Sequence, residues 1–176
     1  MPTWKSRGLR GSALEEMINK TNEKYHEMGL ALIQKIPTPI TPINIDKSTR
    51  QITLAYFDQK STVDYIGAVQ GIPVCFDAKE CRETTFPLHN IHEHQVKFME
   101  DFEKQGGISF FLLYFTKLER FYYLTLDELL FFWNRMEDGG RKSFRMDELK
   151  EEYFFESPNA LWVPFLPMLQ KDLDRR

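Results

Sequence analysis

The chain has 176 residues, of which 42% are hydrophobic and 14% aromatic, and its formal net charge is −3. This composition excludes a disordered or fibrous protein, and no apolar run is long enough to span a bilayer. The N-terminus has no apolar stretch that would indicate a secretory signal, so we expect a soluble cytoplasmic protein with one compact domain over residues 1–176.

Charge is distributed unevenly along the chain. Residues 1–60 hold nine Lys/Arg against six Asp/Glu, whereas residues 61–176 hold 14 against 20. A negative total argues against a surface that binds polyanions everywhere. If nucleic acid binds, we therefore expect much of the phosphate contact in the N-terminal third. The only cysteines, Cys75 and Cys81, are expected to be reduced and buried.

The first third of the chain predicts a helix followed by a hairpin. Ser12 and Glu15 have the spacing of a helix capping box, and apolar residues then recur at helical intervals, which predicts a helix over residues 13–35 with a break near Gly29. The prolines of "IPTPITP" end it, since proline favours extended backbone. Two strand-like runs, "PINID" and "RQITLAYF", flank the polar turn "KSTR" and predict a β-hairpin.

The last two thirds alternate strands and helices. A helix is predicted in "NIHEHQVKFMEDFEK", ended by two glycines, and the apolar run "ISFFLLYF" predicts a strand buried on both faces that pairs with "RFYYLT". A capping box at Thr125 and Glu128 opens a further helix, and a basic cluster then precedes a short acidic helix over residues 147–152. This order predicts a mixed sheet flanked by helices.

A second hairpin, predicted within residues 61–80, brings two carboxylates together. If its two-residue turn lies at positions 70 and 71, opposed residues have numbers that sum to 141, which pairs Asp64 with Asp77 and Thr62 with Lys79. Alternate residues share a face, so all four point to one side and the apolar residues between them to the other. Pro73 suits an edge position, or a bulge that would shift this register.

Two carboxylates about 5 Å apart disfavour each other unless a cation lies between them. A divalent ion such as Mg²⁺, held by carboxylates, waters and phosphate oxygens, would resolve the conflict. Lys79 could then position the attacking water or stabilise charge on the reacting phosphate. The alternative is a solvent-facing strand pair in which Lys79 neutralises two aspartates, and spacing alone leaves both readings open.

Successive blocks of the chain resemble those of the RecU family of Holliday junction resolvases, whose core is that of the PD-(D/E)xK nucleases. The resemblance covers roughly residues 7–152. In order, the blocks are a first one starting at Arg10 ("RGSALEEMINKTN"), then "IPTPITPINID", "AYFDQKSTVDYIG", "FDAKE", "TTFPLHNIHEHQ" and "GRKSFRMDEL".

The resemblance implies an α/β restriction-endonuclease-like mixed sheet flanked by helices, with a protruding β-hairpin stalk at about residues 38–57. It also implies a structure-selective endonuclease that resolves Holliday junctions in recombination and DNA repair with Mg²⁺, or Mn²⁺ in its place. By the same resemblance the metal is surrounded by Thr62, Asp64, Asp77 and Gln95, Lys79 is the catalytic lysine, and Glu15 is an accessory acid. The family's second carboxylate is usually glutamate, so Asp77 is a departure.

The resemblance further implies partners. It assigns DNA contacts to Arg10, Lys35 and Arg50, and it implies four-way junction DNA, a homodimer and an association with the recombinase RecA. The stalk is shortened here between Asp46 and Ala55. Isolated basic residues of this kind are also common as solvated surface charges.

Other readings of the chain remain open. A related nuclease could act on another DNA target, and a non-catalytic DNA-binding or recombinase-regulating module could retain the fold. Three nearby histidines, His89, His92 and His94, suggest zinc but lack a fourth ligand. The final stretch from residue 157 to 176 has no matching block, and its apolar residues Trp162, Phe165 and Leu169 are expected to pack on the core.

Overall fold

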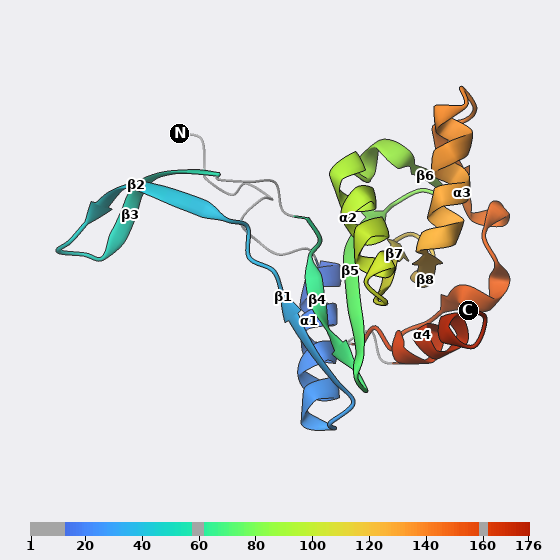
Figure 1. The fold of residues 1–176 in the computed structure, drawn as a ribbon, viewed down its shortest axis with the longest axis horizontal. Coiled ribbons are helices and arrows are strands. Elements are labelled where there is room, and N and C mark those ends of the chain that lie inside the picture. Colours follow the sequence, from blue (N-terminus) through green and yellow to red (C-terminus); the bar gives the residue numbers. More distant parts are fainter. Residues whose placement is uncertain (1–12, 58–61, 159–161) are drawn as a thin grey trace.

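The protein is described by a computed structural model that covers residues 13–57, 62–158 and 162–176 (Figure 1). Within these residues, a six-stranded mixed sheet has the order β1-β4-β5-β7-β8-β10. Its strands are β1 (Ala31–Lys35), β4 (Tyr65–Val69), β5 (Ile72–Cys81), β7 (Ile108–Phe115), β8 (Arg120–Thr125) and β10 (Phe154–Phe155). Neighbouring strands are antiparallel except β5 and β7, which run parallel.

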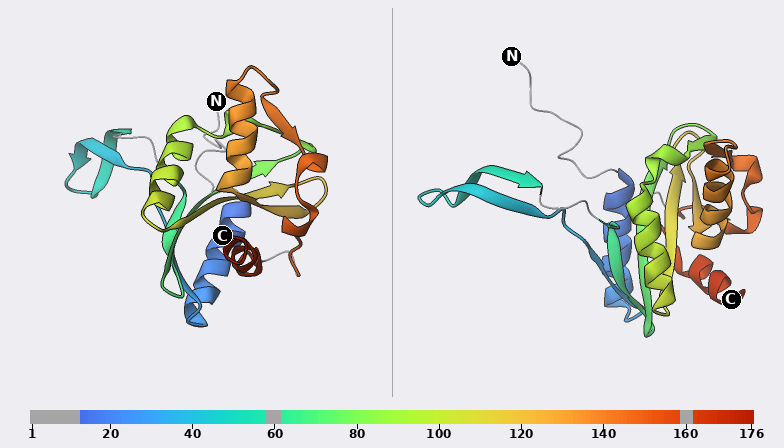
Figure 2. Two further views of the ribbon diagram at one scale, coloured as in Figure 1. Left: turned by 45° about the vertical axis from the view of Figure 1, so that its right-hand side comes forward. Right: turned by 45° about the horizontal axis from the view of Figure 1, so that its top comes forward.

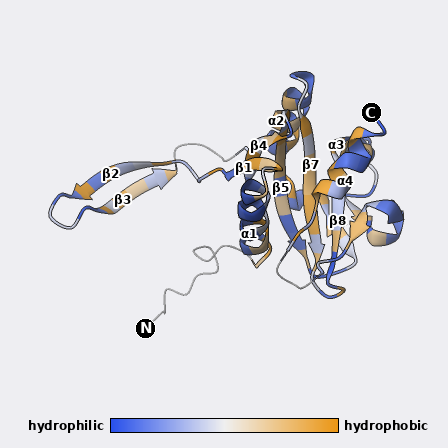
Figure 3. Ribbon diagram, turned by 90° about the horizontal axis from the view of Figure 1, so that it is seen from below, coloured by the Kyte–Doolittle hydropathy of each residue, from blue (hydrophilic) through white to orange (hydrophobic). Residues whose placement is uncertain are grey.

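Helices cover both faces of this sheet. They are α1 (Ala13–Glu27), α2 (Glu93–Lys104), α3 (Leu126–Glu137) and α4 (Leu166–Leu173). Helices α2 and α3 lie on one face, and α1 and α4 on the other (Figure 2). The predicted fold class, a mixed α/β sheet flanked by helices, is confirmed. Hydrophobic residues line the central strands (Figure 3), and β7 is buried along almost its whole length, as its apolar run predicts.

The predicted helix over residues 13–35 is wrong in its last third. Helix α1 ends at Glu27, because Gly29 adopts a positive φ of 67° that a helix does not allow. The chain then reverses, and the residues from Ala31 to Lys35 form strand β1 at the edge of the sheet, antiparallel to β4. Ser12, the first residue of the predicted capping box, lies outside the described residues.

Strands β1 and β4 approach each other closely at Gly67. A Cβ at this position would lie 2.1 Å from the carbonyl oxygen of Leu32, which is far inside van der Waals contact. Gly67→Ala is therefore expected to lower the free energy of unfolding by about 1–3 kcal/mol or more, since backbone atoms must move to relieve the clash. Urea denaturation checks this, with Ala68→Ser, at an exposed position of the same strand, as the control. An unchanged midpoint for Gly67→Ala would contradict the register of β1 on β4.

The hairpin predicted after the prolines is confirmed, and it projects away from the rest of the protein (Figure 1). Strands β2 (Ile40–Asp46) and β3 (Gln51–Phe57) pair antiparallel as a separate two-stranded sheet, with irregular register near Asn44. At the turn, Asp46 Oδ1 accepts hydrogen bonds from the backbone N–H of Ser48 at 2.8 Å and from that of Thr49 at 3.3 Å. The Ser48 hydroxyl donates to the same oxygen at 2.6 Å and is the largest cause that lowers the pKa of the Asp46 carboxyl to about 2, to which the backbone bonds add.

The acidic helix predicted over residues 147–152 is not formed. Two short 3₁₀ turns, Met146–Glu148 and Glu151–Tyr153, stand there instead. They follow strand β9 (Ser143–Arg145), which pairs with β6 (Thr85–Pro87) in a small sheet that sequence reasoning did not anticipate. Glu148 accepts from the backbone N–H of Arg145 at 2.8 Å, and this bond keeps the segment in a turn.

The other predicted elements agree with the structure. Helix α3 begins where Thr125 Oγ1 accepts from the backbone N–H of Glu128 at 3.2 Å, which is half of the predicted capping box. Phe165 and Leu169 are buried, as predicted for the final stretch, and both cysteines are buried and unpaired. Among the described residues, no helix is both long enough and apolar enough to cross a membrane.

Candidate active site

The register predicted for the second hairpin is confirmed. The pairs between β4 and β5 run from Val69 with Ile72 to Tyr65 with Phe76, and each pair sums to 141. Pro73 pairs with Ala68 without a bulge, and β5 pairs with β7 only from Val74 onward, so the missing N–H of the proline interrupts no bond to β7.

Asp64 and Asp77 come together just beyond the last pair of this ladder. Asp64 directly precedes β4, and its Oδ2 accepts a hydrogen bond from the backbone N–H of Ala78 at 3.1 Å. Asp77 lies in the middle of β5, one residue past its last pair with β4, where β5 is paired with Phe111 of β7, and it is fully buried. This position in a central strand places a carboxylate in the protein interior.

The side chains of Gln95 and Lys79 contact the Asp77 carboxylate. Gln95 Nε2 donates to Asp77 Oδ2 at 2.5 Å, and Lys79 Nζ lies 2.6 Å from Oδ1. Beyond that ion pair, no hydrogen bond from the described residues satisfies Oδ1. The Lys79 side chain is 20% exposed, so a partly solvent-accessible side chain pairs with a buried carboxylate.

Burial raises the pKa of Asp77 to about 7, the neighbouring Asp64 carboxylate adds to the rise, and the Lys79 ammonium opposes it. A second carboxylate this close disfavours ionisation because two like charges share one low-dielectric region. The carboxylates of Asp64 and Asp77 therefore repel each other, and a cation between them would relieve this repulsion.

Gln95 is positioned by the start of helix α2. Its Oε1 accepts from the backbone N–H of His92 at 3.1 Å, which closes a capping box, while its Nε2 reaches Asp77. The side chain is 6% exposed. The amide thus orients Asp77 by donating to it, and its oxygen, the atom expected to bind a metal, is engaged in capping α2.

Glu15 and Lys35 lie at the rim of the same site. The Lys35 ammonium pairs with Glu15 Oε2, and the next residue, Ile36, donates its backbone N–H to the carbonyl oxygen of Asp64 at 2.8 Å. The Tyr65 hydroxyl donates to Asn19 Oδ1 at 3.0 Å, and burial, followed by the negative charges of Glu15, Asp64 and Asp77, raises its pKa. Sequence reasoning missed Tyr65, since an aromatic residue in a strand gives no sign of its neighbours.

The remaining predicted site residues lie in different parts of the chain. Thr62 is half-buried and close to Asp64 in sequence, two residues before it and outside the ladder. Arg50 is at the turn of the projecting β2–β3 hairpin, with a positive φ of 56°. Arg10 lies outside the described residues. The structure therefore brings together Asp64, Asp77, Lys79 and Gln95, with Glu15 and Lys35 beside them.

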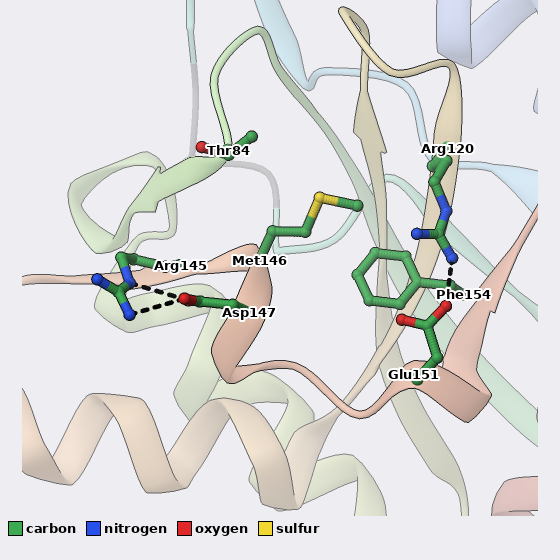
Figure 4. A pocket seen from close by; sticks show the side chains of 7 residues that line it. All are labelled: Thr84, Arg120, Arg145, Met146, Asp147, Glu151 and Phe154. Carbon is green, nitrogen blue, oxygen red and sulfur yellow. Dashed lines mark hydrogen bonds and ion pairs between the residues drawn. The ribbon is translucent and has the colours of Figure 1, made fainter.

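Two other groups of polar side chains among the described residues are less suited to catalysis or metal binding. A cleft of about 390 Å³ near β9 is lined by two arginines, each paired with a carboxylate: Arg145 with Asp147 at 2.7 Å and Arg120 with Glu151 at 2.7 Å (Figure 4). These pairs leave the cleft without an uncompensated charge. The three histidines do not form a zinc site, because no three His, Cys, Asp or Glu side chains among the described residues come together as metal ligands.

A comparison with protein families shows which family the chain belongs to. The family profile of recombination protein U (RecU) matches residues 9–171, which is nearly the whole chain. The chain belongs to the RecU family. The match extends past the last sequence block into α4, so the C-terminal stretch of this RecU-family chain is also part of the family pattern.

Similar proteins carry the same family name. The Holliday junction resolvase RecU of Pediococcus pentosaceus is 41% identical over 172 residues, covering 95% of this chain and 86% of that protein. The Holliday junction resolvases RecU of Bacillus pumilus and Bacillus subtilis are 46% and 42% identical over 146 residues, covering 81% of this chain and 70% of each protein. Among solved structures, that of Archaeoglobus fulgidus Hjc, a Holliday junction resolvase, matches with a TM-score of 0.41 and 8% identity over 66% of this chain and 78% of that chain, a likeness too low to support an argument.

Proposed function

We propose that this RecU-family chain is a Mg²⁺-dependent endonuclease that resolves Holliday junctions. The proposal rests on the fully buried Asp77 carboxylate, which lies beside the Asp64 carboxylate and is ion-paired with Lys79 at 2.6 Å. One ammonium compensates the charge of only one of the two carboxylates. A cation bound between them would compensate the other.

The residues present fit a divalent metal ion of the oxygen-binding kind. Asp64 and Asp77 supply two carboxylates, and Thr62 adds a hydroxyl two residues before Asp64. Gln95 holds Asp77 in place by its hydrogen bond, and it can join the ligand set only if its amide turns over. When bound, Mg²⁺ or Mn²⁺ would supply charge stabilisation for the reacting phosphodiester and a more acidic water.

Lys79 completes the chemistry in this proposal. Its ammonium lies 2.6 Å from Asp77 and the side chain is partly exposed, so the ammonium can meet a phosphate that approaches from solvent. There it orients the attacking water and stabilises the negative charge that builds up on the phosphate oxygens. In-line attack breaks the bond to the 3′-oxygen and leaves a 5′-phosphate.

The projecting hairpin supports the proposal of a homodimer that contacts the junction. Seven of the eleven exposed large hydrophobic residues in the described chain lie on it: Ile40, Ile43, Ile45, Ile52, Leu54, Tyr56 and Phe57. A solvated apolar surface of this kind usually meets a partner. Two-fold pairing through the hairpin would present two sites to a two-fold junction, with Arg10, Lys35 and Arg50 as phosphate contacts. Association with RecA stays a prediction, without an assigned surface.

Selectivity for four-way DNA tests the proposed function. The protein is incubated in Mg²⁺ with a four-way junction and with a linear duplex of the same sequence. We expect paired cuts on opposing strands of the junction and little cutting of the duplex. Equal cutting of both would favour a nuclease with another DNA target, and binding without cutting in either Mg²⁺ or Mn²⁺ would favour a non-catalytic DNA-binding module.

Metal binding itself is expected to stabilise the protein. A ligand at ten times its dissociation constant adds about 1.4 kcal/mol, which corresponds to a rise in Tm of about 3–6 °C for a chain of this size. Thermal denaturation with and without Mg²⁺ measures this rise, and Asp77→Asn should lose most of it because one carboxylate is gone. A wild-type Tm that does not respond to Mg²⁺ or Mn²⁺ would count against the metal site.

A further inference from the structure

Glu80 follows Lys79 in β5 but points to the opposite face of the sheet. Asp77 and Lys79 are paired on the side of α2, where Gln95 lies. Because successive side chains of a strand alternate, Glu80 faces the side of α1. There its Oε1 accepts a hydrogen bond from the backbone N–H of Leu14 at 2.9 Å.

This contact ties the end of β5 to the beginning of α1. Leu14 is the second residue of the helix and is fully buried, and the first N–H groups of a helix have no partner within the helix itself. A carboxylate at this end also interacts favourably with the helix dipole. The two residues are 66 positions apart, so Glu80 acts as an anchor between distant segments and not as a local cap.

The anchored turn of α1 carries Glu15, and contacts continue from it around the candidate site. Glu15 pairs with Lys35 at the end of β1. The next residue, Ile36, is hydrogen-bonded to the carbonyl oxygen of Asp64. Asp64 in turn accepts from the N–H of Ala78, the residue between Asp77 and Lys79. These contacts therefore lead from Glu80 through α1, β1 and Asp64 back to Ala78, which is also on β5.

We propose that Glu80 is a positioning residue for this site: its hydrogen bond to Leu14 holds the first turn of α1 against β5, and so fixes Glu15 and Lys35 at the rim beside Asp64. The inference rests on the proposed nuclease function. A small displacement of groups that meet the substrate reduces the rate of a positioned reaction far more than it reduces the stability of the fold.

The test compares Glu80→Ala and Glu80→Gln in single-turnover cleavage of a four-way junction at saturating protein and Mg²⁺. We expect Glu80→Ala to cut about tenfold more slowly, and its dissociation constant for the junction in chelator to change less than about twofold. Glu80→Gln keeps an oxygen that can accept from Leu14, so it should recover most of the rate. Glu83→Ala is the control, since Glu83 is an exposed carboxylate near the same end of β5 that pairs with Lys117.

Combining Glu80→Ala with Glu15→Ala separates a positioning role of Glu80 from a general effect on the fold, because the two effects on the cleavage rate should then not add. If Glu80 acts through Glu15, Glu80→Ala should slow a Glu15→Ala protein by less than about twofold. A full tenfold loss in that background, or no loss from Glu80→Ala alone, would overturn the proposal.

Hydrogen exchange separates this inference from the proposed function. The Leu14 amide should exchange faster in Glu80→Ala than in the wild type, whether or not the protein cuts junctions. Unchanged exchange at Leu14 would refute the anchor while leaving the nuclease proposal intact. Absence of junction cleavage by the wild type would refute the nuclease proposal, and the positioning role with it.

Discussion

Asp77→Asn is expected to reduce junction cleavage by about 10²–10³-fold or more, the size of loss that follows removal of one preorganised charged group from an active site. Asparagine has the same shape and can still accept the hydrogen bond from Gln95, but it removes the negative charge shared with Asp64 and Lys79. Single-turnover cleavage of a four-way junction in Mg²⁺ measures the loss. Junction binding in chelator should stay within a few-fold of the wild type.

The fold should survive this substitution, because a buried carboxylate beside another carboxylate is itself costly. Circular dichroism and thermal denaturation check that point. Asp101→Asn is the matched control, since Asp101 is an exposed acid of α2 that pairs with Lys104 at 2.8 Å. Cleavage by Asp77→Asn at the wild-type rate would show that Asp77 has no role in the reaction. Loss of folding would favour a structural role for it.

Phe76→Ala is expected to destabilise the protein by about 3–5 kcal/mol. Phe76 directly precedes Asp77 on β5 but points to the other face, where it is fully buried. Its ring stacks on those of Tyr65 and Phe110, with ring centroids 4.7 Å and 4.8 Å apart, and its centroid lies 5.2 Å from that of the Phe165 ring. Alanine would leave a cavity between the sheet and the α1–α4 layer that these rings cannot all close.

Urea denaturation at equilibrium measures the change in the free energy of unfolding. Phe131→Ala is the control, because Phe131 is 64% exposed on α3 and its removal should change stability by no more than about 0.5 kcal/mol. Equal effects from the two substitutions would contradict the packing of the β5 face against α1 and α4.

These two substitutions concern neighbouring residues on opposite faces of β5, and the sequence predicts that division. The geometry of a two-residue turn, together with the alternation of side chains along a strand, is enough to place Asp77 opposite Asp64 and to point Phe76 toward the core. It is not enough to predict that Asp77 is fully buried. That follows from the parallel pairing of β5 with β7, a strand more than 25 residues further along, which no local pattern encodes.

The misassigned end of the first helix has a similar cause. The residues from Ala31 to Lys35 continue an acceptable helical pattern, and only the edge position beside β4 makes them a strand. The positive φ at Gly29 is the local sign of the change. The error matters for function, because as a strand this segment brings Lys35 to Glu15 and its neighbour Ile36 to Asp64.

Gln95 shows what family resemblance adds and what it leaves out. Nothing in the local pattern of α2 links this residue to β5, and the resemblance alone assigned it to the site. The structure then gives it two simultaneous hydrogen bonds, one to the start of α2 and one to Asp77. Glu80 had no such assignment, and its contact with Leu14 depends on how α1 packs against the sheet.

A single cleavage time course tests directly whether Asp64, Asp77 and Lys79 hydrolyse junction DNA with a divalent cation. Wild-type protein and a four-way junction are mixed in Mg²⁺, chelator is added part-way, and excess Mg²⁺ is then restored. We expect cutting to stop in chelator and to resume when Mg²⁺ returns. Cutting that continues in chelator, or no cutting in Mg²⁺ or in Mn²⁺, would contradict this expectation.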